Sequence, residues 1–148
     1  MTPIVVTTEI SRRPDDVFAY VTDPTKLPEW QESIVRVESS EASDRVGRTA
    51  RITRRVGPRE MTMDAEIAEL NPPTSWSVRG LDGPVRGDVK GKIEPLDGGE
   101  RSRVTIELAL HGHGMGKLLL PLVVRRKAET EMPRNMQHLK EHLEQART

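Results

Sequence analysis

The sequence lacks cysteine and carries no net charge. The absence of cysteine among the 148 residues excludes disulfide bonds, thiolate metal sites and a cysteine nucleophile. Lysine and arginine together number 23, as do aspartate and glutamate, so the formal net charge is zero. Because no overall positive field exists to hold a phosphate backbone, we expect no nucleic-acid partner.

Long apolar runs are also missing. A membrane-spanning helix needs roughly 18 apolar residues, and the longest apolar stretch of this chain covers only residues 118–124. The N-terminus has neither a basic start nor an apolar region long enough for a signal peptide. These absences predict a cytoplasmic protein without a membrane span, and the length predicts a single domain covering residues 1–148.

Aromatic residues are few, at 3% of the chain, and hydrophobic residues make up only 34%. The four aromatic residues are Phe18, Tyr20, Trp30 and Trp76. With so few bulky rings, the core has little to fill a space between a sheet and a helix. The composition is therefore compatible with an unfilled cavity inside a small folded domain.

Most of the chain alternates apolar and polar residues with the period of two that is typical of strands covered on one face. Turn residues separate these segments at intervals suited to an antiparallel meander. The predicted strands are residues 4–10, 34–41, 48–56, 60–70, 75–80, 85–95 and 101–111.

Helical patterns occur in two other parts of the chain. Two short helices are expected after the first strand, one beginning at Pro14 and a broken turn over residues 25–30. A long closing helix is expected over residues 117–147, with a kink or break at Pro133, which removes a backbone hydrogen bond. This order predicts an α+β fold in which a curved antiparallel sheet of six to seven strands grips the long C-terminal helix.

Three stretches resemble the SRPBCC superfamily, which has the START-like helix-grip fold, and within it the polyketide cyclase/dehydrase-like branch. They are ISRRPDDVFAYVTD at residues 10–23, LPEW at residues 27–30, and the closing segment from GKLLLP at 116–121 to NMQHLK at 135–140. The resemblance implies a cavity between sheet and helix that binds an apolar small molecule such as a lipid, sterol, polyketide or quinone. It implies no shared catalytic residue.

Arg54 is the least expected residue on the apolar face, because the alternation that turns Ala50, Ile52 and Val56 inward turns Arg54 inward too. A buried guanidinium needs a partner. That partner is either a ligand carboxylate, enolate or phenolate, or a carboxylate of the protein, unless Arg54 emerges at the sheet edge or the register slips by one residue. The surrounding arginine cluster is interpreted as a solvated hairpin.

The other candidate ligand-binding residues combine an apolar body with adaptable shape or free space. Tyr20 and Trp30 fall in the segment that lies near the cavity in the resembling family, and glycine within a strand marks a bend or cleared space. For each, packing in the core or sheet curvature is the alternative. The full set of candidates is Tyr20, Trp30, Arg54, Met61, Met63, Trp76, Val89, Gly91, Met132 and Met136.

Histidine motifs give weaker indications. His138 and His142 match the H-x-x-E-H pattern of a zinc site, but no downstream segment supplies a third ligand, so we expect no metal site. His111 and His113 lie where the last strand ends, and either is a candidate general base. The glycines around them do not form a phosphate-binding or dinucleotide-binding motif, so no cofactor is expected.

These observations leave three functional hypotheses. The first is binding of an apolar small molecule in the cavity. The second is a polyketide cyclase or aromatase, in which Arg54 stabilises an enolate and Tyr20 or His111 moves protons. The third is a protein-partner module that uses the arginine-rich hairpin of residues 48–59. Whether the chain is a monomer or a homodimer stays open.

Overall fold

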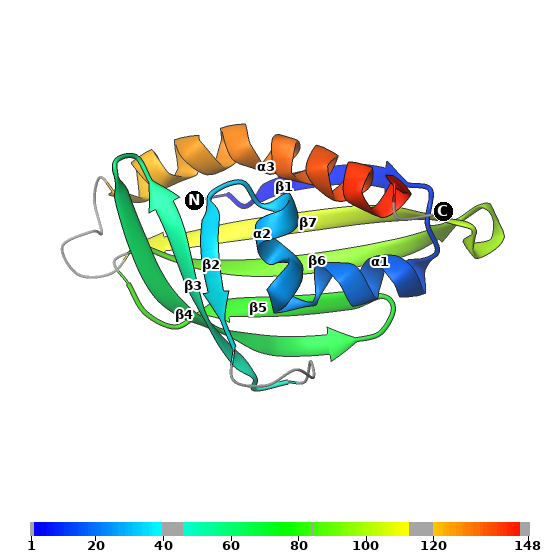
Figure 1. The fold of residues 1–148 in the computed structure, drawn as a ribbon, viewed down its shortest axis with the longest axis horizontal. Coiled ribbons are helices and arrows are strands. Elements are labelled where there is room, and N and C mark those ends of the chain that lie inside the picture. Colours follow the sequence, from blue (N-terminus) through cyan, green and yellow to red (C-terminus); the bar gives the residue numbers. More distant parts are fainter. Residues whose placement is uncertain (1, 40–45, 84, 113–119, 146–148) are drawn as a thin grey trace.

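The chain folds into one curved sheet that wraps around a long helix. The computed structural model describes residues 2–39, 46–83, 85–112 and 120–145. Seven strands form one antiparallel sheet in the order β1-β7-β6-β5-β4-β3-β2 (Figure 1). The strands are β1 (Ile4–Ile10), β2 (Ile34–Glu38), β3 (Thr49–Val56), β4 (Arg59–Asn71), β5 (Ser75–Gly80), β6 (Val85–Leu96) and β7 (Arg101–Gly112).

The predicted α+β helix-grip fold is therefore confirmed, with small differences at the strand ends. β3 begins at Thr49 rather than at Arg48, whereas β1 and β5 have the predicted bounds. The predicted extension of the second strand to residue 41 falls partly on residues 40–45, which lie outside the described residues. The first strand forms one edge of the sheet, where β1 pairs with β7 from Ile4↔Leu108 to Ile10↔Ser102.

The short helices follow β1 as expected. The helix α1 (Pro14–Val21) has its proline in the first turn together with Asp15 and Asp16, and acidic residues there favour the positive helix end. The broken turn resolves into η1 (Pro24–Lys26) and α2 (Leu27–Trp30).

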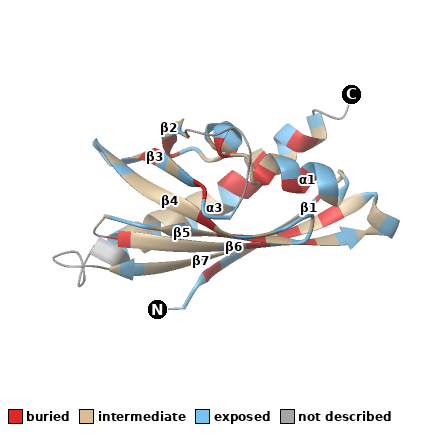
Figure 2. Ribbon diagram, turned by 90° about the horizontal axis from the view of Figure 1, so that it is seen from below, coloured by how far each residue is buried: buried red, intermediate tan, exposed pale blue. Residues whose placement is uncertain are grey.

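The long helix α3 (Leu120–Gln145) lies across the concave face of the sheet, as Figures 1 and 2 show. It continues through Pro133, so of the kink or break predicted there, the break does not occur. Pro133 and Glu129, whose carbonyl loses its donor, are both exposed, and water can therefore hydrate that carbonyl. No helix in the described ranges is both long enough and apolar enough to cross a membrane.

The core is filled where the second half of α3 crosses the sheet. Leu139 of α3, Val17 of α1, and Ile10 and Val104 of the sheet are all at 0% exposure. The red segments of α1, α3 and the strands face one another in Figure 2. This part of the molecule has the close packing of an ordinary protein interior.

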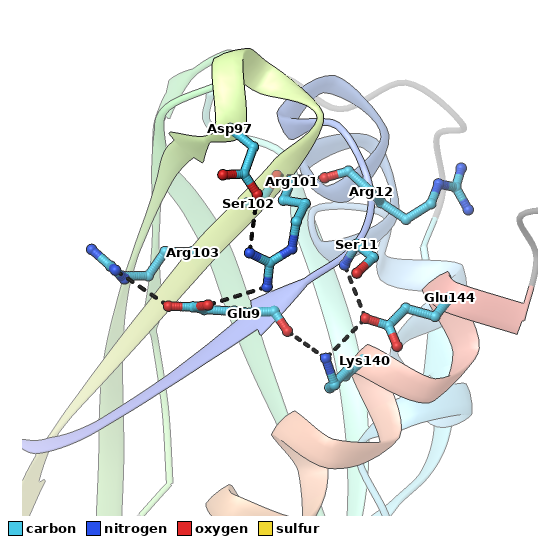
Figure 3. A network of polar contacts seen from close by, with 9 residues as sticks. All are labelled: Glu9, Ser11, Arg12, Asp97, Arg101, Ser102, Arg103, Lys140 and Glu144. Atoms are coloured by element: carbon cyan, nitrogen blue, oxygen red, sulfur yellow. Dashed lines mark hydrogen bonds and ion pairs between the residues drawn. The ribbon is translucent and has the colours of Figure 1, made fainter.

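Polar contacts fasten the same end of α3 to the sheet (Figure 3). The Lys140 ammonium donates to the backbone oxygen of Glu9 at 2.7 Å and to Oε2 of Glu144 at 2.9 Å. Glu144 Oε2 also accepts the backbone N–H of Ser11 at 2.9 Å. We call Glu9, Ser11, Lys140 and Glu144 the C-terminal clamp.

The carboxylates of the C-terminal clamp are held in their charged form. Burial acts to raise the pKa of Glu144, but the hydrogen bonds from Lys140 and Ser11 outweigh it, and the pKa is lowered. Hydrogen bonds from Arg103 and Arg101, each 3.2 Å from the carboxylate, lower the pKa of Glu9. Every charged group of the C-terminal clamp thus has a partner of opposite sign.

Candidate functional site

A cavity of about 280 Å³ lies between the sheet and the first and middle turns of α3, from Val124 to Met136. Along β3, the lining includes Ala50, Ile52, Arg54 and Val56, which alternate along the strand, and also Thr49 and Arg55. The same period of two selects the lining residues of β6 and β7 and most of those of β4, where Glu66 also lines the cavity. The apolar lining outside β3 comprises Val6, Val21, Pro24, Leu27, Trp30, Met63, Ala65, Ile67, Leu70, Trp76, Val78, Val85, Val89, Ile106, Leu108, Leu110, Val124, Ala128, Met132 and Met136.

Small residues leave this space open. Ala50, Ala65, Gly80, Gly87 and Ala128 all line the cavity, and none has a side chain that could extend across it. In the filled end of the core, by contrast, the residues facing one another are larger, such as Leu and Ile. The cavity is therefore a consequence of where the chain places its short side chains.

The structure brings seven of the predicted ligand-binding residues to this lining. They are Trp30, Arg54, Met63, Trp76, Val89, Met132 and Met136. Three others, Tyr20, Met61 and Gly91, are not lining residues. The role of each in binding stays a prediction, but the first group shares one cavity and the second group does not belong to it.

Tyr20 makes its polar contact away from the cavity. Its phenol donates a hydrogen bond to Oε1 of Glu29 at 2.9 Å, and this bond joins α1 to α2. Burial, together with this bond to a carboxylate, raises the pKa of Tyr20. The phenol therefore stays protonated at neutral pH.

Gly91 provides space for a side chain of the protein itself. A Cβ at this position would lie 2.1 Å from Cζ2 of Trp76, its partner across β5 and β6. The indole of Trp76 also meets the ring of Phe18 edge to face, with centroids 6.2 Å apart. The space at Gly91 is thus occupied by the side chain of Trp76.

The histidines lie apart from the cavity. His111 is exposed, and its Nε2 lies 3.2 Å from Oδ2 of Asp88 on the neighbouring strand. His111 does not line the cavity, and His113 lies outside the described residues. No group of three potential metal ligands occurs within the described ranges, which include His138 and His142.

Arg54 points into the cavity as the alternation predicts. Its Nη1 donates to Oγ of Ser33 at 3.1 Å, and its Nη2 donates to Oε1 of Gln31 at 3.2 Å. Burial lowers the pKa of Arg54, and the negative charge of Glu131 partly opposes this effect. The two hydrogen-bond acceptors of the guanidinium, a hydroxyl oxygen and an amide oxygen, are both uncharged.

The interpretation of the arginine cluster as a solvated hairpin needs a correction. Arg51, Arg55 and Arg59 are exposed, and Arg51 and Arg55 have acidic partners across the β3–β4 hairpin. Arg48, however, is only 5% exposed and lines the cavity, as Arg54 does. Arg55, although exposed, also borders the cavity, so three arginines of this cluster reach its lining.

Sequence reasoning missed the polar residues that surround Arg54. Lys127 and Glu131 of α3 form an ion pair of 3.4 Å beside the cavity, and Asn135 lies one turn further along. A signal was available, because Glu131 and Asn135 each follow a predicted helix-face residue, Ala128 or Met132, by three positions. Gln31 and Ser33 lie between predicted elements, where no periodicity marks them.

Solved structures share this fold. A protein from Thermus thermophilus is 15% identical, with a TM-score of 0.80 and 99% of both chains covered. A START superfamily protein from Mycobacterium smegmatis is 15% identical, with a TM-score of 0.79 and the same coverage. The di-domain ARO/CYC protein BexL of the BE-7585A biosynthetic pathway is 18% identical, with a TM-score of 0.73 over 97% of this chain.

The match to BexL covers 47% of that protein, so the chain spans about half of its length. No curated protein matches the sequence. Residues 1–144 match the family described as polyketide cyclase / dehydrase and lipid transport. With the helix-grip fold and this match over nearly the whole sequence, the resemblance to the SRPBCC superfamily is confirmed, and the chain belongs to the polyketide cyclase / dehydrase and lipid transport family.

Proposed function

We propose that this protein binds an apolar small molecule, such as a lipid, polyketide or quinone, in the cavity between the sheet and α3. The observation that carries the proposal is the cavity of about 280 Å³ with its predominantly apolar lining. This volume is close to the lower end of the roughly 300–1,000 Å³ range of small-molecule sites. Affinity would come from burial of apolar surface, and the few polar groups would orient the ligand.

A cyclase reaction gains less support from the geometry. The mechanism considered from the sequence needs Arg54 to act on the same substrate as Tyr20 or His111. Neither of these two lines the cavity, and each already contacts a carboxylate, Glu29 or Asp88. Binding is therefore the function that we propose, in a protein whose predicted location remains the cytoplasm.

The first test is to find what the protein carries. Native mass spectrometry of the purified chain, followed by solvent extraction of the same sample, should give an added mass that matches an extracted apolar compound. A protein free of such a compound should instead bind the uncharged fluorescent probe N-phenylnaphthylamine, with an increase in emission. If no compound is carried and the probe gives no increase, the proposal is wrong.

A pair of variants on α3 links binding to the cavity. Ala128→Trp places an indole in the lined space and should weaken probe binding at least about tenfold, since it fills the volume that the probe needs. Thr130→Trp puts the same side chain on the exposed face of the same helix and should leave binding unchanged. Equal binding by the two variants would show that the probe binds elsewhere.

A further inference from the structure

The cavity has one end where charged and polar groups gather. We call this the Arg54 end, and it consists of Gln31, Ser33, Arg54, Lys127 and Glu131, all of which line the cavity. They come from three places in the sequence, the segment after α2, strand β3 and helix α3. The lining elsewhere is mainly apolar, and its other charged residues have partners: Arg48 donates to Ser39, Arg55 pairs with Glu60, and Glu66 pairs with Arg79.

The charges at the Arg54 end do not balance. Arg54 and Lys127 are cations, and Glu131 is the one carboxylate in this group. Oε1 of Glu131 lies 3.4 Å from Lys127 Nζ, which leaves Arg54 with a long-range interaction with Glu131 but no salt bridge to any described carboxylate. One positive charge is therefore in excess in a partly desolvated place, where an unpaired charge is unfavourable.

The donors of Arg54 are also incompletely used. A guanidinium has five N–H donors. Ser33 and Gln31 accept one each, and among the described residues no acceptor for the others is found. These two contacts fix the orientation of the guanidinium while they leave its charge uncompensated. A planar group oriented in this way is suited to a carboxylate, which accepts two parallel hydrogen bonds.

The C-terminal clamp shows what a satisfied cation looks like in the same protein. There Lys140 lies 2.9 Å from Glu144, and the arginines beside Glu9 lie 3.2 Å from its carboxylate. Arg54 differs from these cations in having two uncharged acceptors and open space beside it. The space is where a compensating anion from outside the chain would be accommodated.

From this imbalance we infer that the ligand of the cavity is an acidic amphiphile, with a carboxylate bound by Arg54 and an apolar body that extends along the sheet. The inference rests on the proposed function and narrows its ligand class. It assigns to Arg54 the selection of acids over esters and amines of the same shape. Ser33 and Gln31 act as positioning residues, since they orient the guanidinium.

The test compares ligands that differ only in their polar end. Dodecanoic acid, methyl dodecanoate and dodecylamine are each used to displace N-phenylnaphthylamine near neutral pH. The acid should bind about tenfold more tightly than the ester, because a charge-assisted hydrogen bond is worth more than a neutral one. The amine should bind most weakly of the three, since its charge has the same sign as that of Arg54.

Variants then assign the preference to its residue. Arg54→Gln should bring the acid and the ester to equal affinity while the probe still binds. Glu131→Gln removes the competing negative charge and should strengthen acid binding by about threefold or more, a gain that a damaged fold cannot produce. Arg51→Gln, on the same strand but outside the lining, is the matched control and should leave the acid preference intact.

The two proposals fail in distinguishable ways. If the probe binds but wild-type protein prefers the ester or makes no distinction, the acidic-ligand inference is wrong and apolar binding stands. The inference is also wrong if Arg54→Gln keeps the full preference for the acid. If neither the probe nor dodecanoic acid binds, the proposed function itself is wrong, and the inference falls with it.

Discussion

The two halves of α3 cover different parts of the same sheet. The second half, with Leu139 and Leu143, packs onto a filled core and is fastened at its end by the C-terminal clamp. The first half, with Val124 and Ala128, lies over the cavity. One continuous helix thus stabilises the fold at one end and borders an open space at the other.

The difference shows how a small domain can keep a cavity without losing its fold. The apolar burial that holds the sheet to α3 is concentrated where large side chains meet. The first half of the helix therefore contributes less to the free energy of unfolding. Charge follows the same division, because Lys140 of the C-terminal clamp and the two arginines beside its Glu9 have carboxylate partners, whereas Arg54 has uncharged acceptors. Stability and the candidate site are therefore separated along one element.

The largest expected effect tests this division of stability. Leu139→Ala should lower the free energy of unfolding by about 3 kcal/mol, since it opens a void at a fully buried position. Met132→Ala, seven residues earlier on the same helix, should cost about 1 kcal/mol, because its side chain already borders open space. Urea denaturation followed by circular dichroism measures both. Equal losses would contradict the contrast between the two halves.

A smaller effect is expected from two glycines of β6. Gly91→Ala should destabilise the protein by about 2 kcal/mol, because the new Cβ would meet the ring of Trp76 at 2.1 Å. Gly87→Ala brings its Cβ to 3.0 Å from Cδ1 of Leu108, a flexible side chain beside the cavity. It should therefore cost less than about 1 kcal/mol. A larger loss for Gly87→Ala in thermal unfolding would reverse this ranking.

The smallest expected effect is a dependence of stability on pH that comes from the C-terminal clamp. The folded-state pKa of Glu144 is below its ordinary value of 4.5, so its contribution is complete above that pH and is lost as the pH falls through the folded value. Glu144→Gln should therefore reduce the free energy of unfolding by only about 0.5 kcal/mol at neutral pH, because its side chain is partly exposed, and by less in acid.

The measurement is urea denaturation of wild type and Glu144→Gln at pH values from neutral down to acid. Thr130, on the exposed face of α3, offers a control, because Thr130→Ala should change stability equally at every pH. A constant difference between wild type and Glu144→Gln across the range would mean that the carboxylate charge plays no part in the C-terminal clamp.

The arrangement of elements could be predicted because it depends on local signals. Alternation located the seven strands, and proline with acidic residues marked the start of α1. The inward position of Arg54 followed from the same alternation. Of the kink or break predicted at Pro133, the break was wrong, since the packing of α3 against the sheet overrules the local preference of proline.

The details of the site depend on distances that no period encodes. The space at Gly91 is filled by Trp76, which lies fifteen residues earlier and pairs with it only through the sheet. Met61 continues the apolar face of β4 but is not a lining residue, because the face extends further than the cavity. The partners of Arg54 come from a loop and a helix, and only the folded chain brings them to one place.

The pairing of the first strand with the last also fixes an order of events during synthesis. Ile4 pairs with Leu108, so β1 must wait until about 100 further residues have been made, which takes roughly 5–20 seconds on a ribosome. Helix α3 follows β7 and docks later still. The elements β1, β7 and α3, which all contribute lining residues, are thus assembled last. A ligand can be captured in the cavity only after most of the chain has left the ribosome.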